Sequence, residues 1–109
     1  METRILIIDD DPFICRQLEE LYRAQGYVVD SATEAPAALA KLGQHDYSLV
    51  LVDLKIPGTD GLNLTREIRD RWQDIDVIMI TGYASIKGAV EAIKLGASDY
   101  ITKPFQNEE

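Results

Sequence analysis

Short apolar runs alternate along this chain with segments of helical periodicity. The runs are rich in β-branched residues and fall at residues 4–8, 27–29, 47–52, 77–80 and 100–102. They are largely apolar at consecutive positions rather than at every second one, which is typical of strands buried on both faces of a parallel sheet. The pattern therefore predicts five buried strands.

Between these strands, apolar residues recur at intervals of three and four, which predicts amphipathic helices. The stripes consist of Ile14, Leu18, Leu21 and Tyr22; Ala35, Ala38, Leu39 and Leu42; Leu64, Ile68 and Trp72; and Ile86, Ala89, Val90 and Ile93. Asp11 and Pro12 suit the start of the first helix, and Gly26 suits its end. Gly43 and Gly96 are predicted to end the second and fourth helices. Strand and helix thus alternate, so the predicted fold class is α/β, a doubly wound five-stranded parallel sheet with helices on both faces.

The length of 109 residues is that of one domain, which we place at residues 1–109. Residues 103–109 fall where the alternation requires a fifth helix, and no apolar stripe is present there. We therefore expect the final helix to be truncated or absent, and the natural protein to continue beyond Glu109 with an output domain.

The charge and the cysteine content narrow the class of protein. With 19 acidic and 11 basic side chains the net charge is −8, and such a surface repels the phosphates of nucleic acids. No apolar run approaches the ~20 residues that span a bilayer. The single cysteine, Cys15, cannot form a disulfide framework, so a reducing cytoplasm is the expected compartment.

Polar residues follow the predicted strands directly. Asp9 and Asp10 follow the first strand, Asp53 the third, Thr81 the fourth and Lys103 the fifth. In a doubly wound sheet the carboxyl ends of the strands form one ligand-binding edge. Carboxylates gathered there repel one another, and their oxygen atoms favour Mg²⁺ as the neutralising cation. Zinc is not expected, because the chain has no Cys/His cluster.

Phosphoryl transfer to a carboxylate fits these residue types. A carboxylate oxygen can act as the nucleophile. A metal ion and Lys103 would spread the developing charge, and the Thr81 hydroxyl could hold a phosphoryl oxygen. Spacing alone leaves open which of the acids is the nucleophile.

The ordered set of motifs resembles the response regulator receiver family, whose fold is flavodoxin-like and CheY-like. The residues that carry the resemblance are Asp9, Asp10, Asp53, Thr81, Tyr100 and Lys103-Pro104-Phe105, supported by segments 53–58, 60–61 and 96–100. They span essentially the whole chain. The stretch from Thr81 to Ile86, together with Lys55, resembles receivers of NtrC-type transcription activators.

The resemblance implies a role for each site residue. Asp53 would accept a phosphoryl group from a sensor histidine kinase. Asp9, Asp10, Asp53 and the backbone carbonyl of Lys55 would hold Mg²⁺. The protein would be a phosphorylation switch rather than an enzyme, catalysing only its own phosphoryl transfer and autodephosphorylation.

The same resemblance implies how the signal leaves the site. Thr81 and Lys103 would contact the phosphoryl group, and Thr81 and Tyr100 would form a switch pair. The altered face would control the downstream output domain, in transcription regulation, and could support a homodimer. This segment would contact neither nucleic acid nor membrane.

Other interpretations remain at this stage. Residues 5–11 also match the nucleophile motif of haloacid-dehalogenase-like phosphatases, with Asp9 as the nucleophile, although this leaves Asp53 unexplained. A receiver-like interaction module without phosphorylation is a further alternative. Asp11 is interpreted as a helix cap, His45 as a surface residue, and Cys15 as a packing residue.

Overall fold

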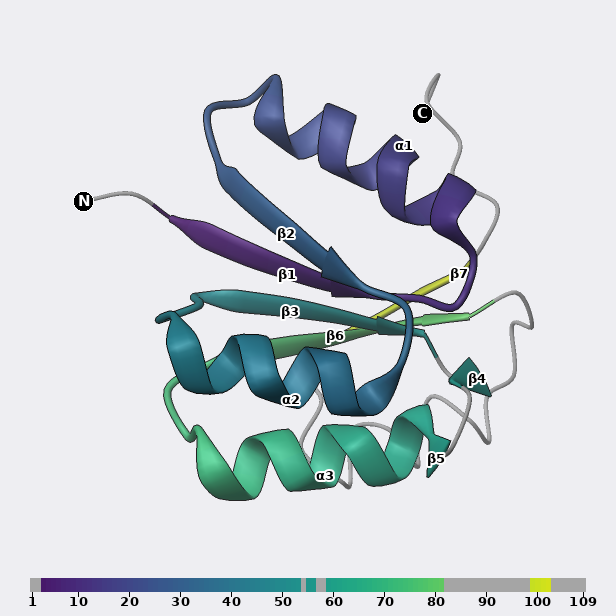
Figure 1. Ribbon diagram of the computed structural model, residues 1–109, viewed down its shortest axis with the longest axis vertical. Coiled ribbons are helices and arrows are strands. Elements are labelled where there is room, and N and C mark those ends of the chain that lie inside the picture. The colour runs from purple at the N-terminus through teal and green to yellow at the C-terminus, as the bar shows by residue number, and fades with distance from the viewer. Residues whose placement is uncertain (1–2, 54, 57–58, 82–98, 103–109) are drawn as a thin grey trace.

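Five parallel strands form the central sheet of the computed structural model, which describes residues 3–53, 55–56, 59–81 and 99–102. The sheet has the order β2-β1-β3-β6-β7 (Figure 1). Its strands are β1 (Arg4–Ile8), β2 (Val28–Ala32), β3 (Leu49–Asp53), β6 (Asp76–Thr81) and β7 (Asp99–Thr102). The short strands β4 (Lys55–Ile56) and β5 (Thr59–Asp60) form a separate antiparallel pair. The predicted five-stranded parallel sheet is confirmed.

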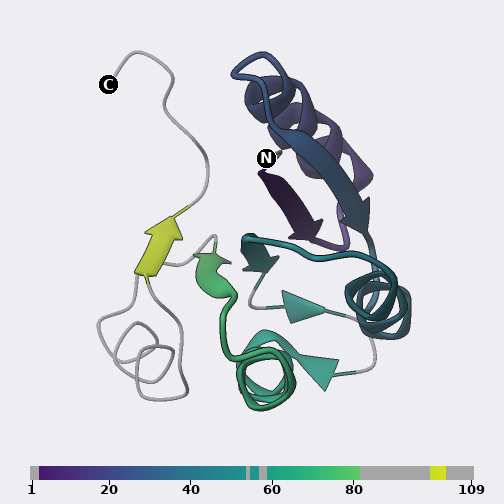
Figure 2. The same cartoon turned by 90° about the vertical axis from the view of Figure 1, so that its left-hand side faces the viewer.

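Helices cover both faces of the sheet. They are α1 (Pro12–Arg23), α2 (Ala35–Gln44) and α3 (Gly61–Arg71). Figures 1 and 2 show α1 on one side, with α2 and α3 on the other. The doubly wound arrangement is therefore confirmed. The helix predicted around residues 86–93, and the question of a final helix after residue 102, lie outside the described residues.

Strand β1 contributes to a separate core on each face. Ile5 and Ile7 belong to the cluster that includes Leu18 of α1, whereas Leu6 and Ile8 belong to the cluster beneath α2 and α3. All four β1 side chains are at most 2% exposed. Burial of each such side chain contributes about 1.5–3 kcal/mol. Consecutive apolar residues in β1 are thus explained by burial on both faces.

The predicted ends of the first two helices are only partly right. The Asp11 side chain caps α1 by accepting from Phe13 N, and Gly26 has the positive φ of 99° that favours glycine. The prediction for Gly43 was wrong, because α2 passes through it and ends at Gln44. His45 is extended and caps this helix, with its N–H donating to Lys41 O. A glycine without a positive φ does not by itself end a helix.

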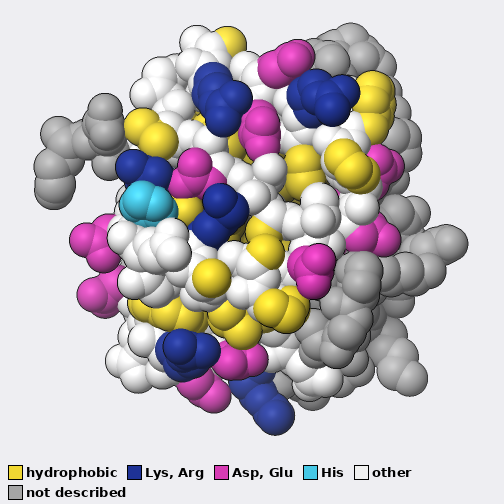
Figure 3. All heavy atoms as spheres, in the orientation of Figure 1, with side chains coloured by type: hydrophobic (Ala, Val, Ile, Leu, Met, Phe, Trp, Pro, Cys, Tyr) yellow, Lys and Arg dark blue, Asp and Glu magenta, His cyan; other side chains and the backbone are white. Residues whose placement is uncertain are grey.

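The described surface mixes acidic and basic side chains. On the face seen in Figure 3, Lys and Arg are scattered among Asp and Glu, with small apolar areas between them. Among the described helices, none is long and apolar enough to cross a bilayer.

A polar network joins β1, β2 and the segment before β3. Arg4 Nη1 and the Tyr47 hydroxyl both donate to Asp30 Oδ2, at 2.9 and 2.7 Å. Burial raises the pKa of Asp30, but the bonds from Tyr47 and Arg4 outweigh it, so the pKa lies below its usual value. Burial and then the bond to Asp30 raise the pKa of Tyr47, which keeps its hydroxyl a donor.

We expect Tyr47→Phe to lower the free energy of unfolding by about 1–2 kcal/mol at pH 7, because a hydrogen bond to a carboxylate is lost. The pKa of Asp30 is depressed in the folded state, so this stabilisation is complete above about pH 4 and is lost as the pH falls through the lower folded-state pKa. Urea denaturation from pH 3 to 7 measures the difference. Tyr27→Phe is the control, since Tyr27 is an exposed aromatic residue. A difference that grows towards low pH would contradict the assignment.

Candidate functional site

The register of the central strands brings two acids together. Ile8 of β1 is paired with Val52 of β3. Asp9 follows Ile8 and Asp53 follows Val52, so both acids occupy the carboxyl edge of the sheet. Both strands are buried, which fixes their register, since a slip of one residue would turn the apolar side chains to the opposite face.

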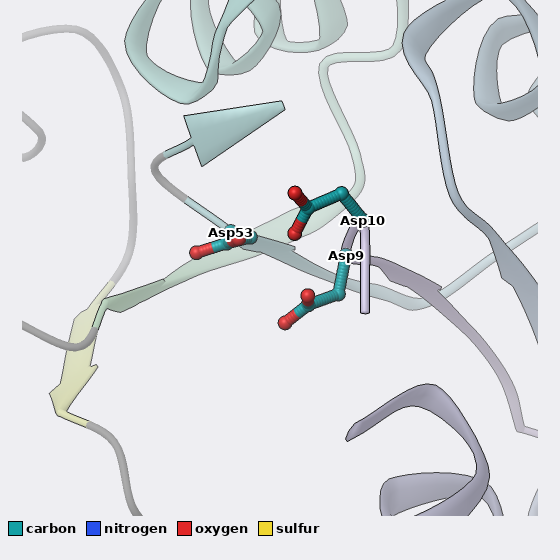
Figure 4. Close-up of side chains that lie close together, drawn as sticks. All are labelled: Asp9, Asp10 and Asp53. Carbon is teal, nitrogen blue, oxygen red and sulfur yellow. The ribbon is translucent and has the colours of Figure 1, made fainter. Parts of the chain in front are cut away.

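Three carboxylates converge at this edge. One oxygen from each of Asp9, Asp10 and Asp53 lies within 4.8 Å of the others. In Figure 4 the three side chains extend to the same side of the strand ends. Asp9 is fully buried, Asp53 is 6% exposed and Asp10 is exposed. The cluster is therefore buried at Asp9 and Asp53 and open to solvent at Asp10.

The residue Asp9 is held by bonds to its main chain and its side chain. Its N–H donates to Ala32 O at 3.1 Å, which ties it to the end of β2. Its Oδ1 accepts from Asp11 N at 2.9 Å, and its carbonyl accepts from Cys15 Sγ at 3.4 Å. Asp9 thus takes its position from β2 and from the first turn of α1.

The donor set fits a hard divalent cation. Two unit charges ~4 Å apart repel by about 4 kcal/mol at an effective dielectric of 20, and here three carboxylates share one small volume. Carboxylate oxygens are the preferred protein ligands of Mg²⁺ and Ca²⁺. An exposed member, Asp10, leaves room for water and for a further oxygen ligand. The chemistry of the site therefore matches a cation of the Mg²⁺ or Ca²⁺ class.

The other predicted site residues are only partly within the described structure. Lys55 lies in β4, two residues after Asp53, with its backbone paired to Asp60. Thr81 ends β6, one residue after Ile80, the partner of Asp53. Tyr100 lies on β7, and Lys103 lies outside the described residues.

The backbone register relates Thr81 to Tyr100. Tyr100 is paired with Met79, and Thr81 with Thr102. Thr81 and Tyr100 are therefore two register positions apart on neighbouring strands. Thr81 also follows Ile80, whose partner on β3 is Asp53. The predicted switch positions share one region of the backbone.

A hollow of about 510 Å³ lies at the other edge of the sheet. It is lined by residues that precede β3 and β6: His45, Asp46, Tyr47, Arg71, Trp72, Gln73, Asp74 and Ile75. Because the strands are parallel, this amino edge is remote from the carboxylates. His45 is exposed there, as expected for a surface residue.

The sequence interpretation missed the contacts that hold Asp9. Cys15 was interpreted as a packing residue, and it is indeed buried, but its thiol also bonds to the Asp9 carbonyl. Burial and the nearby Asp9 charge raise the pKa of Cys15 to about 11. No sequence pattern predicts a hydrogen bond between a thiol and a backbone carbonyl six residues away, so this contact is seen only in the structure.

Comparison with known proteins agrees with this geometry. The family model of the response regulator receiver domain matches residues 5–109. Two-component response regulator PhoP of Pseudomonas aeruginosa is 33% identical over 97% of this chain and 47% of its own length. Regulatory protein AtoC of Escherichia coli is 36% identical over 98% of this chain and 23% of its own length. The chain thus spans about half or a quarter of the length of these relatives.

A solved structure adds a chemical parallel. A response regulator protein from Burkholderia pseudomallei aligns with a TM-score of 0.91 and 34% identity, over 98% of this chain and 63% of that one. It contains a phosphorylated aspartic acid, a calcium ion and citrate. The chain therefore belongs to the response regulator receiver family of two-component systems, whose members are signalling switches that bind a divalent metal at an acidic pocket.

Proposed function

We propose that this receiver domain accepts a phosphoryl group on Asp53 from the phosphohistidine of a sensor histidine kinase. Mg²⁺ would be held by Asp9, Asp10, Asp53 and the backbone carbonyl of Lys55. The observation that carries the proposal is the convergence of the Asp9, Asp10 and Asp53 carboxylates within 4.8 Å at the carboxyl edge. Membership of the receiver family and the phosphorylated aspartic acid of the Burkholderia relative support it.

The surroundings of the three acids favour Asp53 as the acceptor. Asp9 is fully buried and its Oδ1 already accepts from Asp11 N. Asp10 is exposed, which leaves it more freedom to change rotamer. Asp53 ends the strand between β1 and β6, adjoining both Asp9 and Thr81, and is slightly exposed. These positions also argue against the phosphatase alternative, which needs Asp9 as the nucleophile.

The transfer is a direct displacement at phosphorus. An oxygen of the Asp53 carboxylate forms the new P–O bond while the P–N bond to the kinase histidine breaks, and the imidazole leaves with the electron pair. The bound cation would supply charge neutralisation of the carboxylates and the phosphoryl oxygens. Lys103 and the Thr81 hydroxyl would bind phosphoryl oxygens, and hydrolysis of the acyl phosphate by water would reset the domain.

The output would follow from the neighbouring strands. Thr81 would move to the phosphoryl group and Tyr100 would respond, changing the face that includes β7. That change would control an output domain in transcription regulation, through a homodimer or by release of the next domain. NtrC-type regulators occur among the relatives, AtoC being one. We place the protein in the cytoplasm, where the kinase's phosphohistidine is made, and assign this segment no contact with nucleic acid or membrane.

We expect acetyl phosphate with Mg²⁺ to add one phosphoryl group, detected by intact-mass spectrometry, and Asp53→Asn to abolish the adduct because the nucleophilic oxygen is gone. Asp46→Asn, at the amino edge, should be labelled like the wild type. The adduct should be lost when EDTA removes the metal.

Two outcomes would contradict this assignment. An adduct that survives Asp53→Asn and disappears in Asp9→Asn would favour the phosphatase alternative. The absence of any adduct on folded wild type would favour a module that is not phosphorylated.

In EDTA, we expect Asp53→Asn and Asp10→Asn to be more stable than the wild type by about 1–3 kcal/mol, because each removes a carboxylate from the repelling cluster. Millimolar Mg²⁺ should raise the melting temperature of the wild type and affect both variants much less. Thermal denaturation with and without Mg²⁺ measures both effects. Asp46→Asn is again the control. Variants that are less stable in EDTA would show that repulsion does not dominate this cluster.

A further inference from the structure

A buried thiol holds the peptide group between the first two acids of the site. Cys15, on the first turns of α1, is 3% exposed, and its Sγ donates to the Asp9 carbonyl at 3.4 Å. The Ser31 side chain of β2 lines the same small hollow as Cys15. Cys15 therefore lies where three elements meet at the carboxyl edge: α1, β2 and the end of β1.

The bonded carbonyl has a special place in the chain. It belongs to the planar peptide unit that joins Asp9 to Asp10. Fixing the orientation of this plane restrains ψ of Asp9 and φ of Asp10, and these torsions direct the two Cα–Cβ bonds. On its other side, Asp9 N–H is fixed to Ala32 O. The thiol bond thus restrains the directions of two carboxylates at once.

We propose that Cys15 is a positioning residue for the cation site, acting through its bond to the Asp9 carbonyl rather than only by filling space. This inference rests on the proposed function, because it assumes that Asp9 and Asp10 bind the metal ion. Groups that orient metal ligands commonly change metal affinity by 10–100-fold when they are removed. A thiol is a weak donor, so the effect of losing this one should lie near the lower end.

Packing alone makes a different prediction. Cys15 belongs to the cluster that also contains Leu18 and Ile7. If it only filled space there, any side chain of similar volume would serve equally well. A valine and a threonine have nearly the same shape, and only the threonine keeps a hydrogen-bond donor. This pair of substitutions separates the two roles.

The test compares the Mg²⁺ dissociation constant of the wild type, Cys15→Val and Cys15→Thr, measured by isothermal titration calorimetry without a phosphodonor. We expect about a tenfold weaker affinity for Cys15→Val, with most of the loss recovered in Cys15→Thr. Leu18→Val is the matched control, because it trims the same cluster without touching Asp9, and its Mg²⁺ affinity should equal that of the wild type.

A kinetic readout adds a second criterion. With acetyl phosphate, Cys15→Val should need more Mg²⁺ for half-maximal labelling of Asp53, yet reach the wild-type rate at saturating Mg²⁺. If Cys15→Val does not fold, Cys15→Ala and Cys15→Ser provide the same comparison of a side chain without and with a donor.

The outcomes separate this inference from the proposed function. Equal affinities in the wild type, Cys15→Val and Cys15→Thr would overturn the positioning role, and so would equal losses in the last two, because shape would then explain the effect. If the folded wild type bound no Mg²⁺, the proposed metal site itself would fail.

Discussion

Electrostatic repulsion among the carboxylates of Asp9, Asp10 and Asp53 is the main physical constraint on the structure of this domain. One oxygen of each lies within 4.8 Å of the others, and Asp9 is fully buried. Such a cluster opposes folding, because like charges repel one another at this separation. It persists only if the surrounding structure holds the acids in place. The same cost makes the site responsive, since a cation that relieves the repulsion binds the folded state selectively.

The central strands provide that hold. β1 and β3 lie inside the sheet, between β2 and β6, and their side chains are buried on both faces. A slip of either strand by one residue would move every side chain into the core on the opposite face, where the packing does not fit it. The acids therefore cannot separate by sliding, and their repulsion is left to be relieved by a bound ligand. Stability and function are coupled here through the register of one strand pair, Ile8 with Val52.

The strands and the meeting of Asp9 with Asp53 could be predicted from the sequence, because there the local pattern agrees with the long-range structure. Continuous apolar runs predicted the strands, and the rule that parallel strands end at one edge brought Asp9 and Asp53 together. The prediction for the second strand was too short, because β2 extends through Asp30 and Ser31. It is an edge strand in the described sheet, so polar residues are tolerated there. The contacts of Asp30 with Arg4 and Tyr47 join residues 26 and 17 apart, beyond any local pattern.

The two edges of the sheet handle charge in opposite ways. Near the amino edge, the charge of Asp30 is satisfied within the chain by Arg4 and Tyr47, so that region has little to gain from an added ion. At the carboxyl edge the acids face one another, so a cation or a phosphoryl group changes the local free energy strongly. Under the proposed mechanism, a phosphoryl group on Asp53 would therefore act first on the neighbouring end of β6 and on β7.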